Sequence, residues 1–318
     1  MSDNSTSDTK NTCFSTISKN TLTLSDFSER DKPWDKHRAN AEKIEGFYRN
    51  SEFQKYADRM KLCSEVLSFI LVPNEGELKL KLNNARFCRV RHCPICQWRR
   101  SLMWKAKAYK ILPKIQEIYP KYRWLFVTLT IRNCEIKELR LHLKWMNESF
   151  KRLTKLKDFP ADGWLKSIEV TRSNQGEAHP HFHCLLLVKP SYFSHGYLSQ
   201  KSWCNLWQKC LRINYQPILD IKVVKKDTSP KSLIPELLKY CTKESDMTAD
   251  KEWLLELTRQ MKNVRCISTG GILKLYLSKL ENEPDDLIGH GKESSEIKKD
   301  YFYFEWKRSA KKYKLTNS

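Results

Sequence analysis

The middle of the chain alternates between strand-like and helix-like patterns of hydrophobic and polar positions. Residues 124–131 are β-branched and aromatic, which is typical of a strand, whereas residues 135–156 place apolar side chains at helical spacing. The expected strands are 124–131, 165–171, 181–189 and 218–224, and the expected helices are 135–156, 198–211 and 229–240. This order is the split βαβ arrangement of ferredoxin-like folds with one extra helix. It predicts an α+β fold whose central antiparallel sheet carries helices on one face.

Regions of different character flank this core. Residues 1–30 are polar and lack periodicity, as expected for a disordered tail. Outside the core, we expect helices at 34–60, 99–118, 250–261 and 273–280, and a turn at 266–271. The predicted organisation is a tail at 1–30, a helical and Cys-rich region at 31–122, the core at 123–246, and a C-terminal helical region with a basic tail at 247–318.

The strong positive charge of the chain indicates a polyanionic partner. The 318 residues include 58 Lys and Arg against 37 Asp and Glu, a formal net charge of +21. Residues 86–123 contain eleven basic residues and one acid, Glu117, interleaved with aromatic residues. Basic groups neutralise phosphates and aromatic rings can stack on unpaired bases. The expected partner is therefore nucleic acid, because a merely solvated surface would not concentrate the charge in this way.

The eleven cysteines are expected to be reduced thiols. The first ten residues are polar and carry no secretory signal, and no run of about 18 apolar residues predicts a membrane span. We therefore expect a cytoplasmic protein with no membrane partner, in which some of the thiols bind metal.

Four cysteines are candidate zinc ligands. Cys93 and Cys96 form a C-x-x-C pair around a proline, and two thiolates from one tight turn can share a tetrahedral ion. Cys88 supplies a third ligand, and Cys63 is the preferred fourth with His92 as its rival. Buried free thiols are the alternative, but the clustering favours zinc. A bound zinc would hold basic residues on a rigid DNA-binding platform, and these are Arg86, Arg89, Arg91, Arg99 and Arg100.

A histidine-rich strand offers a second metal site. Residues 179–183 read HPHFH, and because strand side chains alternate, His181 and His183 lie on one face. The third ligand is either Glu169 on the preceding strand or His179, since the sequence does not fix the hairpin register. Such ligands suit Mn²⁺ or Mg²⁺ bound together with a phosphate oxygen. The alternative is a solvated His-rich turn.

A third motif lies on the helix expected at 229–240. Glu236 and Tyr240 are four residues apart and share a helix face, which Lys243 joins. A phenol beside a lysine can be activated as a phenolate that attacks phosphorus, and Glu236 can act as a general base. On its own, such a helix face is usually a solvated ion-pair surface. The catalytic interpretation therefore depends on the histidine strand that precedes it.

Together these motifs resemble the rolling-circle plasmid replication initiators of the HUH endonuclease superfamily, over residues 63 to about 280. The matching segments are FVTLT at 126–130 followed by Asn133, HPHFH at 179–183, and ELLKYCTK at 236–243. Cys63 and the segment CRVRHCPICQWRR resemble the zinc-finger-like segment of the single-tyrosine branch. No second tyrosine replaces Glu236, so a two-tyrosine mechanism does not match.

The resemblance implies an HUH-type sheet and a site-specific single-strand DNA endonuclease that also rejoins its product. Tyr240 would attack a phosphate in single-stranded or hairpin DNA at the plasmid origin and stay joined to the 5′ phosphate. The free 3′ hydroxyl would prime synthesis, and Glu236 would activate water for the terminating cleavage. The implied partners are origin DNA and a host helicase with other replication proteins in a bacterial cytoplasm. The implied ions are Mn²⁺ or Mg²⁺ for catalysis and structural Zn²⁺.

Two other hypotheses stay open. A non-catalytic, zinc-dependent nucleic-acid-binding protein would use the basic segment at 86–123 and keep the histidine strand as structure. A single-tyrosine HUH transposase or relaxase would keep the chemistry and act on other DNA. The cysteine segment and the Glu-to-Tyr spacing speak against this last hypothesis.

Overall fold

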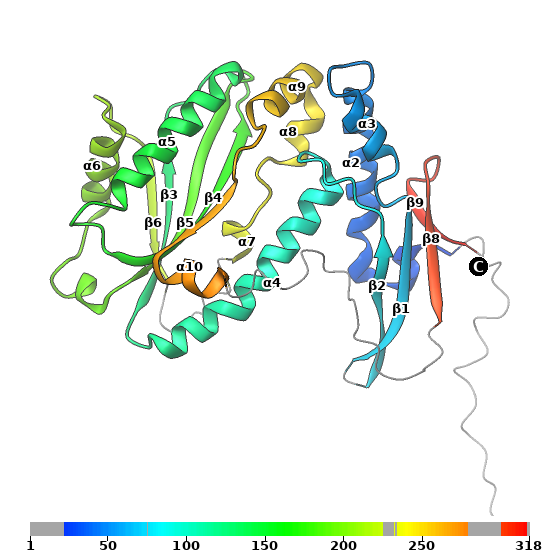
Figure 1. Ribbon diagram of the computed structural model, residues 1–318, viewed down its shortest axis with the longest axis horizontal. Coiled ribbons are helices and arrows are strands. Elements are labelled where there is room, and N and C mark those ends of the chain that lie inside the picture. The colour runs from blue at the N-terminus through cyan, green and yellow to red at the C-terminus, as the bar shows by residue number, and fades with distance from the viewer. Residues whose placement is uncertain (1–21, 75, 225–231, 233, 279–299, 317–318) are drawn as a thin grey trace, which may run out of the picture.

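The computed structural model describes residues 22–74, 76–224, 232, 234–278 and 300–316, and folds them into two β-sheets flanked by helices (Figure 1). A five-stranded sheet in the order β6-β3-β5-β4-β7 forms one end of the molecule, and a four-stranded sheet in the order β2-β1-β8-β9 forms the other. Among the described helices, none has the length and apolar character needed to span a bilayer. The predicted α+β class is confirmed.

The five-stranded sheet contains the predicted split βαβ order. Its strands are β3 (Arg123–Thr130), β4 (Ala161–Arg172), β5 (Ala178–Val188), β6 (Leu219–Val223) and β7 (Ile267–Gly270). The connecting helices are η3 (Ile136–Glu138) and α5 (Leu139–Leu153) between β3 and β4, and η4 (Pro190–Phe193) and α6 (Gln200–Leu211) between β5 and β6. All neighbouring strands are antiparallel. The expected strands and connecting helices are therefore confirmed to within a few residues.

Both faces of this sheet are covered by helices, so the prediction of helices on one face is wrong. Val127 and Phe182 point to the face where α5 and α6 lie, and they share a core with Leu143 of α5. Phe126 and Leu185 point to the opposite face and share a second core with residues of three other helices. Those helices are α4 (Pro94–Ile118), α7 (Ile234–Leu237) and α10 (Gly271–Ser278). The candidate catalytic side chains lie on this second face.

The four-stranded sheet joins segments from the two ends of the described chain. Its hairpins are β1 (Val66–Asn74) with β2 (Glu77–Ala85), and β8 (Tyr301–Lys307) with β9 (Lys312–Thr316). The central pairing is between β1 and β8. The predicted basic tail is wrong for residues 301–316, because Phe304, Trp306 and Tyr313 are buried in the core of this sheet.

The predicted disordered tail is wrong for residues 22–30. Helices α1 (Leu24–Phe27) and η2 (Glu29–Asp31) occupy this segment, and Leu24 is buried. Residues 1–21 of the predicted tail lie outside the described residues. The helix expected at 34–60 is two helices, α2 (Pro33–Tyr48) and α3 (Gln54–Lys61), and Asn50 between them has a φ of 53°, which ends helical geometry.

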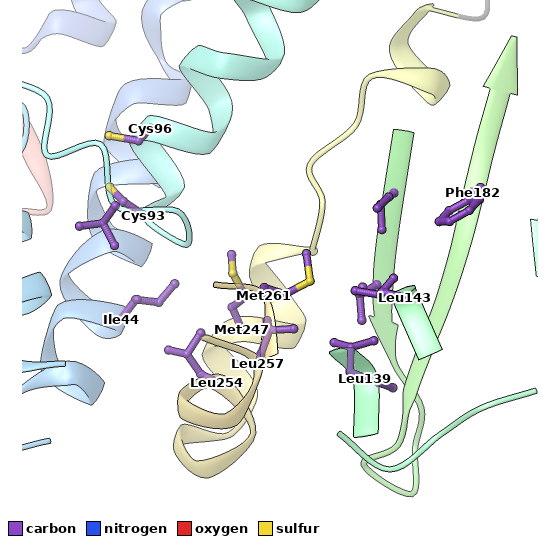
Figure 2. Close-up of a cluster of buried hydrophobic side chains, with 14 of the residues drawn as sticks. Ile44, Cys93, Cys96, Leu139, Leu143, Phe182, Met247, Leu254, Leu257 and Met261 are labelled. Atoms are coloured by element: carbon purple, nitrogen blue, oxygen red, sulfur yellow. The ribbon is translucent and has the colours of Figure 1, made fainter. Parts of the chain in front are cut away.

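Helices α8 (Glu244–Ala249) and α9 (Lys251–Gln260) connect the two halves of the molecule. Figure 2 shows their side chains between α2 and the start of α4 on one side and α5 on the other. The labelled residues include Ile44, Cys93, Met247, Leu254, Leu257, Met261, Leu139 and Leu143. These residues belong to one continuous core, so the two sheets are held together by buried apolar contacts.

The predicted helix through Tyr240 is wrong beyond Leu237, and its residues 229–231 and 233 lie outside the described part. After α7 the chain turns to the edge of β4, where the Val170 amide donates to the Cys241 carbonyl at 2.8 Å. An open strand edge offers unpaired N–H groups, and this segment satisfies one of them at the expense of its own helix.

The predicted turn at 266–271 is also wrong in part, because residues 267–270 form β7 and pair with β4. The Ile168 amide continues this pairing by donating to the Cys266 carbonyl at 2.8 Å. A Cβ at Gly270 would meet the Trp164 ring at 2.3 Å, so only glycine lets this strand approach β4 so closely. The segment after α7 and strand β7 therefore both lie beside β4.

Candidate metal centres and the tyrosine loop

Glu169, His181 and His183, called here the Glu-His-His cluster, meet through the register of β4 and β5. Glu169 is the direct cross-strand neighbour of His181, and His183 lies two residues further along β5. The Glu169 Oε2 atom lies 2.9 Å from His181 Nε2 and 2.8 Å from His183 Nε2. All three side chains are buried. The register that the sequence does not fix therefore brings Glu169 to the histidines.

The far nitrogens of both imidazoles are held by neighbouring groups. His183 Nδ1 lies 3.3 Å from the Thr128 hydroxyl, and His181 Nδ1 lies 3.3 Å from the His179 carbonyl. The Phe126 ring stacks on His183 with centroids 5.7 Å apart. These contacts aim both Nε2 atoms at Glu169, as in metal sites where an outer partner fixes the ring.

The Glu-His-His cluster fits a divalent cation. Its three ligand atoms lie within 4.8 Å of one another. Burial alone would oppose ionisation of Glu169, but hydrogen bonds from His181 and His183 outweigh burial and lower the pKa of its carboxyl. An ionised carboxylate with two oriented imidazoles leaves positions free for other oxygen ligands. When bound, such an ion acts as a Lewis acid on a phosphate.

His179, the alternative third ligand, is not part of this cluster. Its ring is half-buried, and its Nδ1 lies 2.6 Å from the Asn133 side-chain oxygen. Asn133 in turn donates to Glu177 at 3.0 Å. The structure therefore places His179 in a hydrogen-bonded group at the loop end of the hairpin.

Cys63, Cys88, Cys93 and Cys96, called here the Cys cluster, come together as predicted. Their sulfur atoms are 3.8 Å apart for Cys63 and Cys93, 3.8 Å for Cys63 and Cys96, and 3.5 Å for Cys88 and Cys96. Four sulfurs at about 2.3 Å from a tetrahedral zinc would be about 3.8 Å apart, so the spacing fits zinc.

Hydrogen bonding in the Cys cluster also favours a thiolate at Cys96. The amides of Cys88 and Arg89 donate to the sulfurs of Cys63 and Cys96, at 3.4 and 3.3 Å. Hydrogen bonds with the other thiols of the cluster hold the pKa of Cys96 far below its ordinary value, whereas burial raises that of Cys93. The rival ligand His92 lies elsewhere, 3.1 Å from the Thr258 hydroxyl, and burial lowers its pKa to about 3.

The tyrosine motif is arranged differently from the prediction. Because α7 ends at Leu237, Glu236, Tyr240 and Lys243 share no helix face. Glu236 instead pairs with Lys239 at 2.5 Å, and Lys243 is exposed at the start of α8. Burial, and then the charge of Glu244, raise the pKa of Tyr240 to about 12. The predicted activation of the phenol by Lys243 is therefore not what this geometry provides.

The tyrosine loop, residues 238–243, nevertheless lies against the strand that carries Glu169. The Ser167 hydroxyl, on the same face of β4 as Glu169, donates to the Leu237 carbonyl at 2.5 Å. The Val170 amide holds the Cys241 carbonyl. The chain is thus attached to β4 on both sides of Tyr240, at Ser167 and Val170, which flank Glu169 in the sequence.

Tyr240 also lines a cavity of about 360 Å³, called here the basic cavity. The cationic side chains that line it are Arg89, Arg91, Arg100, Lys239 and Arg265. The Arg91 guanidinium is fixed by bonds to the Val264 carbonyl at 2.7 Å and to the Cys266 sulfur at 3.0 Å. Such a cavity suits a phosphate group.

Two of the predicted DNA-binding arginines lie outside the basic cavity. Arg99 sits over the rings of Trp34 and Phe87, at 5.6 and 5.4 Å from their centroids. Arg86 is exposed just after β2. The predicted group is therefore split, with Arg89, Arg91 and Arg100 beside the tyrosine and the other two elsewhere on the N-terminal half.

Three residues beside the tyrosine were not predicted. His37 of α2 places its Nε2 atom 3.5 Å from the Tyr240 hydroxyl, and its Nδ1 atom lies 2.5 Å from Glu244 Oε1. Asn40 donates to the other oxygen of Glu244 at 2.5 Å. No local sequence pattern links residue 37 to residue 240, so only the folded chain reveals this group.

Comparisons with known proteins agree with the motifs. The model of a family described as replication protein matches residues 79–314. A "Protein rep" from Lactiplantibacillus plantarum is 35% identical over 283 residues, which cover 82% of this chain and 87% of that protein. A "Protein rep" from Lentilactobacillus hilgardii is 31% identical over 274 residues, covering 81% and 86%. No solved structure matches the chain. The chain belongs to the replication protein family, in agreement with its resemblance to rolling-circle plasmid replication initiators.

Proposed function

We propose that this protein initiates plasmid rolling-circle replication by nicking one DNA strand at the origin through a covalent phosphotyrosine. The single observation that carries the proposal is the attachment of the tyrosine loop to β4 beside Glu169, through Ser167 and Val170. The nucleophile and the Glu-His-His cluster are thereby anchored to the same strand.

The chemistry assigned to the site is a transesterification. The Tyr240 oxygen forms a bond to the phosphorus, the bond from phosphorus to the 3′ oxygen breaks, and a free 3′ hydroxyl remains. Glu169, His181 and His183 would hold Mn²⁺ or Mg²⁺, which supplies charge stabilisation for the phosphate oxygens. Because the phosphotyrosine ester keeps the energy of the original phosphodiester, rejoining needs no other energy source.

The surrounding cations position the DNA. Arg91 and Arg100 would neutralise phosphates next to the reacting one, since both line the basic cavity with Tyr240. We assign the remaining basic surface of residues 31–122, held by zinc in the Cys cluster, to origin binding. Glu236 is half-exposed and pairs with Lys239, which lines the basic cavity, and we assign it to water activation in the terminating cleavage.

The test is covalent adduct formation. Purified protein with Mn²⁺ is incubated with an end-labelled single-stranded oligonucleotide that carries the nick site of its own replicon, and products are separated on a denaturing gel. The wild type is expected to form a labelled protein–DNA adduct, and Tyr240→Phe to form at least ~10³-fold less while still binding the oligonucleotide.

Tyr197→Phe is the matched control, because Tyr197 is exposed in the segment between β5 and α6 and should change nothing. An adduct formed by Tyr240→Phe at the wild-type rate would remove Tyr240 from the mechanism. Binding without any adduct in the wild type would favour the non-catalytic, zinc-dependent DNA-binding protein. Nicking at transposon ends in place of a plasmid origin would favour the transposase.

A further inference from the structure

The Tyr240 hydroxyl faces an imidazole that comes from 203 residues earlier in the chain. His37 Nε2 lies 3.5 Å from the hydroxyl oxygen, and the two rings are 6.0 Å apart at 75°. This is a long contact, of the kind that commonly tightens only when substrate is bound. The imidazole belongs to α2, in the half of the molecule that carries the Cys cluster.

The His37 imidazole is held in one orientation. Its Nδ1 atom faces Glu244 at 2.5 Å, and the Asn40 amide fixes the other carboxylate oxygen. The ring also packs on Trp98 of α4, with centroids 4.7 Å apart and planes at 30°. With the Nδ1 proton donated to Glu244, the Nε2 lone pair faces the phenol. His37 and Glu244 are both nearly enclosed.

The phenol needs such a base. Burial and the charge of Glu244 raise the pKa of Tyr240 to about 12, so the hydroxyl is neutral at physiological pH. A neutral phenol is a weak nucleophile toward phosphorus. Lys243, the residue expected to activate it, is exposed at the start of α8, and Glu236 is paired with Lys239. A nucleophile, a base and an orienting carboxylate in sequence form a recognised catalytic arrangement.

We propose that His37 is the general base that accepts the Tyr240 proton during nicking, with Glu244 as the residue that positions it. The proposal rests on the proposed function and adds a residue to it. As the Tyr240 oxygen bonds to phosphorus, its proton moves to His37 Nε2, and the departing 3′ oxygen takes a proton from solvent. Glu244 stabilises the resulting imidazolium through the Nδ1 proton.

The same arrangement serves the reverse step. When the 3′ hydroxyl attacks the phosphotyrosine, it loses its proton to solvent, and the imidazolium returns its own proton to the departing phenol oxygen, as microscopic reversibility requires. Rejoining and nicking should therefore depend on His37 to the same extent. This also explains why the N-terminal half is built against the nuclease sheet through α8, whose first residue is Glu244.

The main test replaces His37 with a residue of similar size that cannot act as a base. With the oligonucleotide and Mn²⁺ of the adduct assay, His37→Gln is expected to slow single-turnover adduct formation about 100-fold at pH 7, with unchanged oligonucleotide affinity. The defect should shrink as pH rises, because hydroxide then removes the phenol proton. His142→Gln, at a half-buried histidine of α5 on the other face of the sheet, is the matched control and should match the wild type.

A second substrate separates the two proton transfers. An oligonucleotide with sulfur in place of the 3′ bridging oxygen has a leaving group that needs no proton. The His37→Gln defect should persist with it. Three results for His37→Gln would each overturn the assignment of His37. They are full rescue by the sulfur substrate, a wild-type rate on the normal substrate, and a defect of equal size at every pH.

Glu244→Gln covers the case in which His37→Gln does not fold, judged by zinc content and melting temperature. It keeps the imidazole, should slow adduct formation about 10-fold, and should move the acid limb of the pH–rate profile to lower pH. An unmoved profile contradicts the proposal. Failure of the proposed function itself is distinguishable, since then Tyr240→Phe forms the adduct as the wild type does.

Discussion

The Cys cluster and the Glu-His-His cluster are both buried sets of metal-ligating side chains, but the fold holds them in different ways. The four cysteines come from three separate places: the end of α3, the segment after β2, and the start of α4. The glutamate and the histidines lie on adjacent strands that are already paired by backbone hydrogen bonds along most of their length. The Cys cluster therefore links separate parts of the chain, whereas the Glu-His-His cluster lies on two strands whose backbone pairing does not depend on it.

From this difference we expect the Cys cluster to serve the stability of the fold and the Glu-His-His cluster to serve its chemistry. Four thiols complete a tetrahedral ion and leave no position for substrate, which is typical of structural zinc. Three mixed ligands leave positions open, which is typical of catalysis. Loss of the Cys cluster should therefore unfold the N-terminal half, and loss of the Glu-His-His cluster should stop nicking in a folded protein.

The largest expected effect is on stability. Cys93→Ser removes a ligand from a fully buried cluster, and we expect it to lower the free energy of unfolding by at least ~4 kcal/mol and to abolish zinc binding. Urea denaturation and zinc content measure both. Cys204→Ser, at a buried cysteine of α6 outside the cluster, is the control and should cost about 1 kcal/mol. Equal zinc content in Cys93→Ser and wild type would contradict the structural role.

The converse experiment removes a ligand of the proposed catalytic site. His181→Ala is expected to reduce adduct formation about 10³-fold and to change the free energy of unfolding by only ~1–2 kcal/mol, because β4 and β5 remain paired. His179→Ala, two residues earlier and bonded to Asn133, should stay within about threefold of the wild type. If both variants lost activity equally, His179 would have to be counted as a ligand.

A smaller effect concerns the basic cavity beside Tyr240. Arg100→Gln should weaken binding of a single-stranded oligonucleotide and reduce the slope of log affinity against log salt by about 1, since one phosphate contact is lost. Lys144→Gln, at an exposed lysine of α5 on the other face of the sheet, should leave the slope unchanged. An unchanged slope for Arg100→Gln would place the DNA elsewhere.

The same comparison explains which parts of the molecule the sequence could predict. The β4–β5 hairpin is local, so the alternation of its side chains and the loop at 173–177 suffice to predict His181 and His183 on one face. The Cys cluster could be predicted from the sequence because C-x-x-C spacing reflects the geometry of one turn. In both cases the relevant contacts are short in sequence or have a periodicity that a pattern can show.

Contacts between distant segments could not be read in this way. Strand β1 pairs with β8, so that Val66 lies opposite Glu305, and neither strand has a sequence pattern that predicts its partner. The end of α7 is set by the edge of β4, which takes up the backbone of Cys241. His37 reaches Tyr240 only because α8 and α9 fill the space between the two sheets. Long-range packing overrides local propensity at each of these places.

The smallest expected effect involves a buried cation that belongs to neither cluster. Lys166 lies on the α5 face of β4, with its ammonium 2.5 Å from Asn147 Oδ1 and 4.0 Å from the centroid of Phe182. Burial lowers its pKa to about 8 from its ordinary value of 10.5. Between these two values the unfolded chain binds more protons than the folded one, so this lysine makes stability rise as pH increases across that window.

Lys166→Met should therefore raise the free energy of unfolding at pH 7 by ~1 kcal/mol. Relief of the buried charge is worth about 3 kcal/mol for a shift of this size, and loss of the Asn147 and ring contacts offsets most of it. The gain should shrink as pH rises from 8 toward 10.5, because the folded amine is then neutral and the unfolded amine increasingly loses its proton. Urea denaturation at pH 7 and pH 10 measures the difference, with adduct formation unchanged. A destabilised Lys166→Met at pH 7 would mean that the lysine is held for structure, and that buried polar groups outside the two clusters also stabilise this fold.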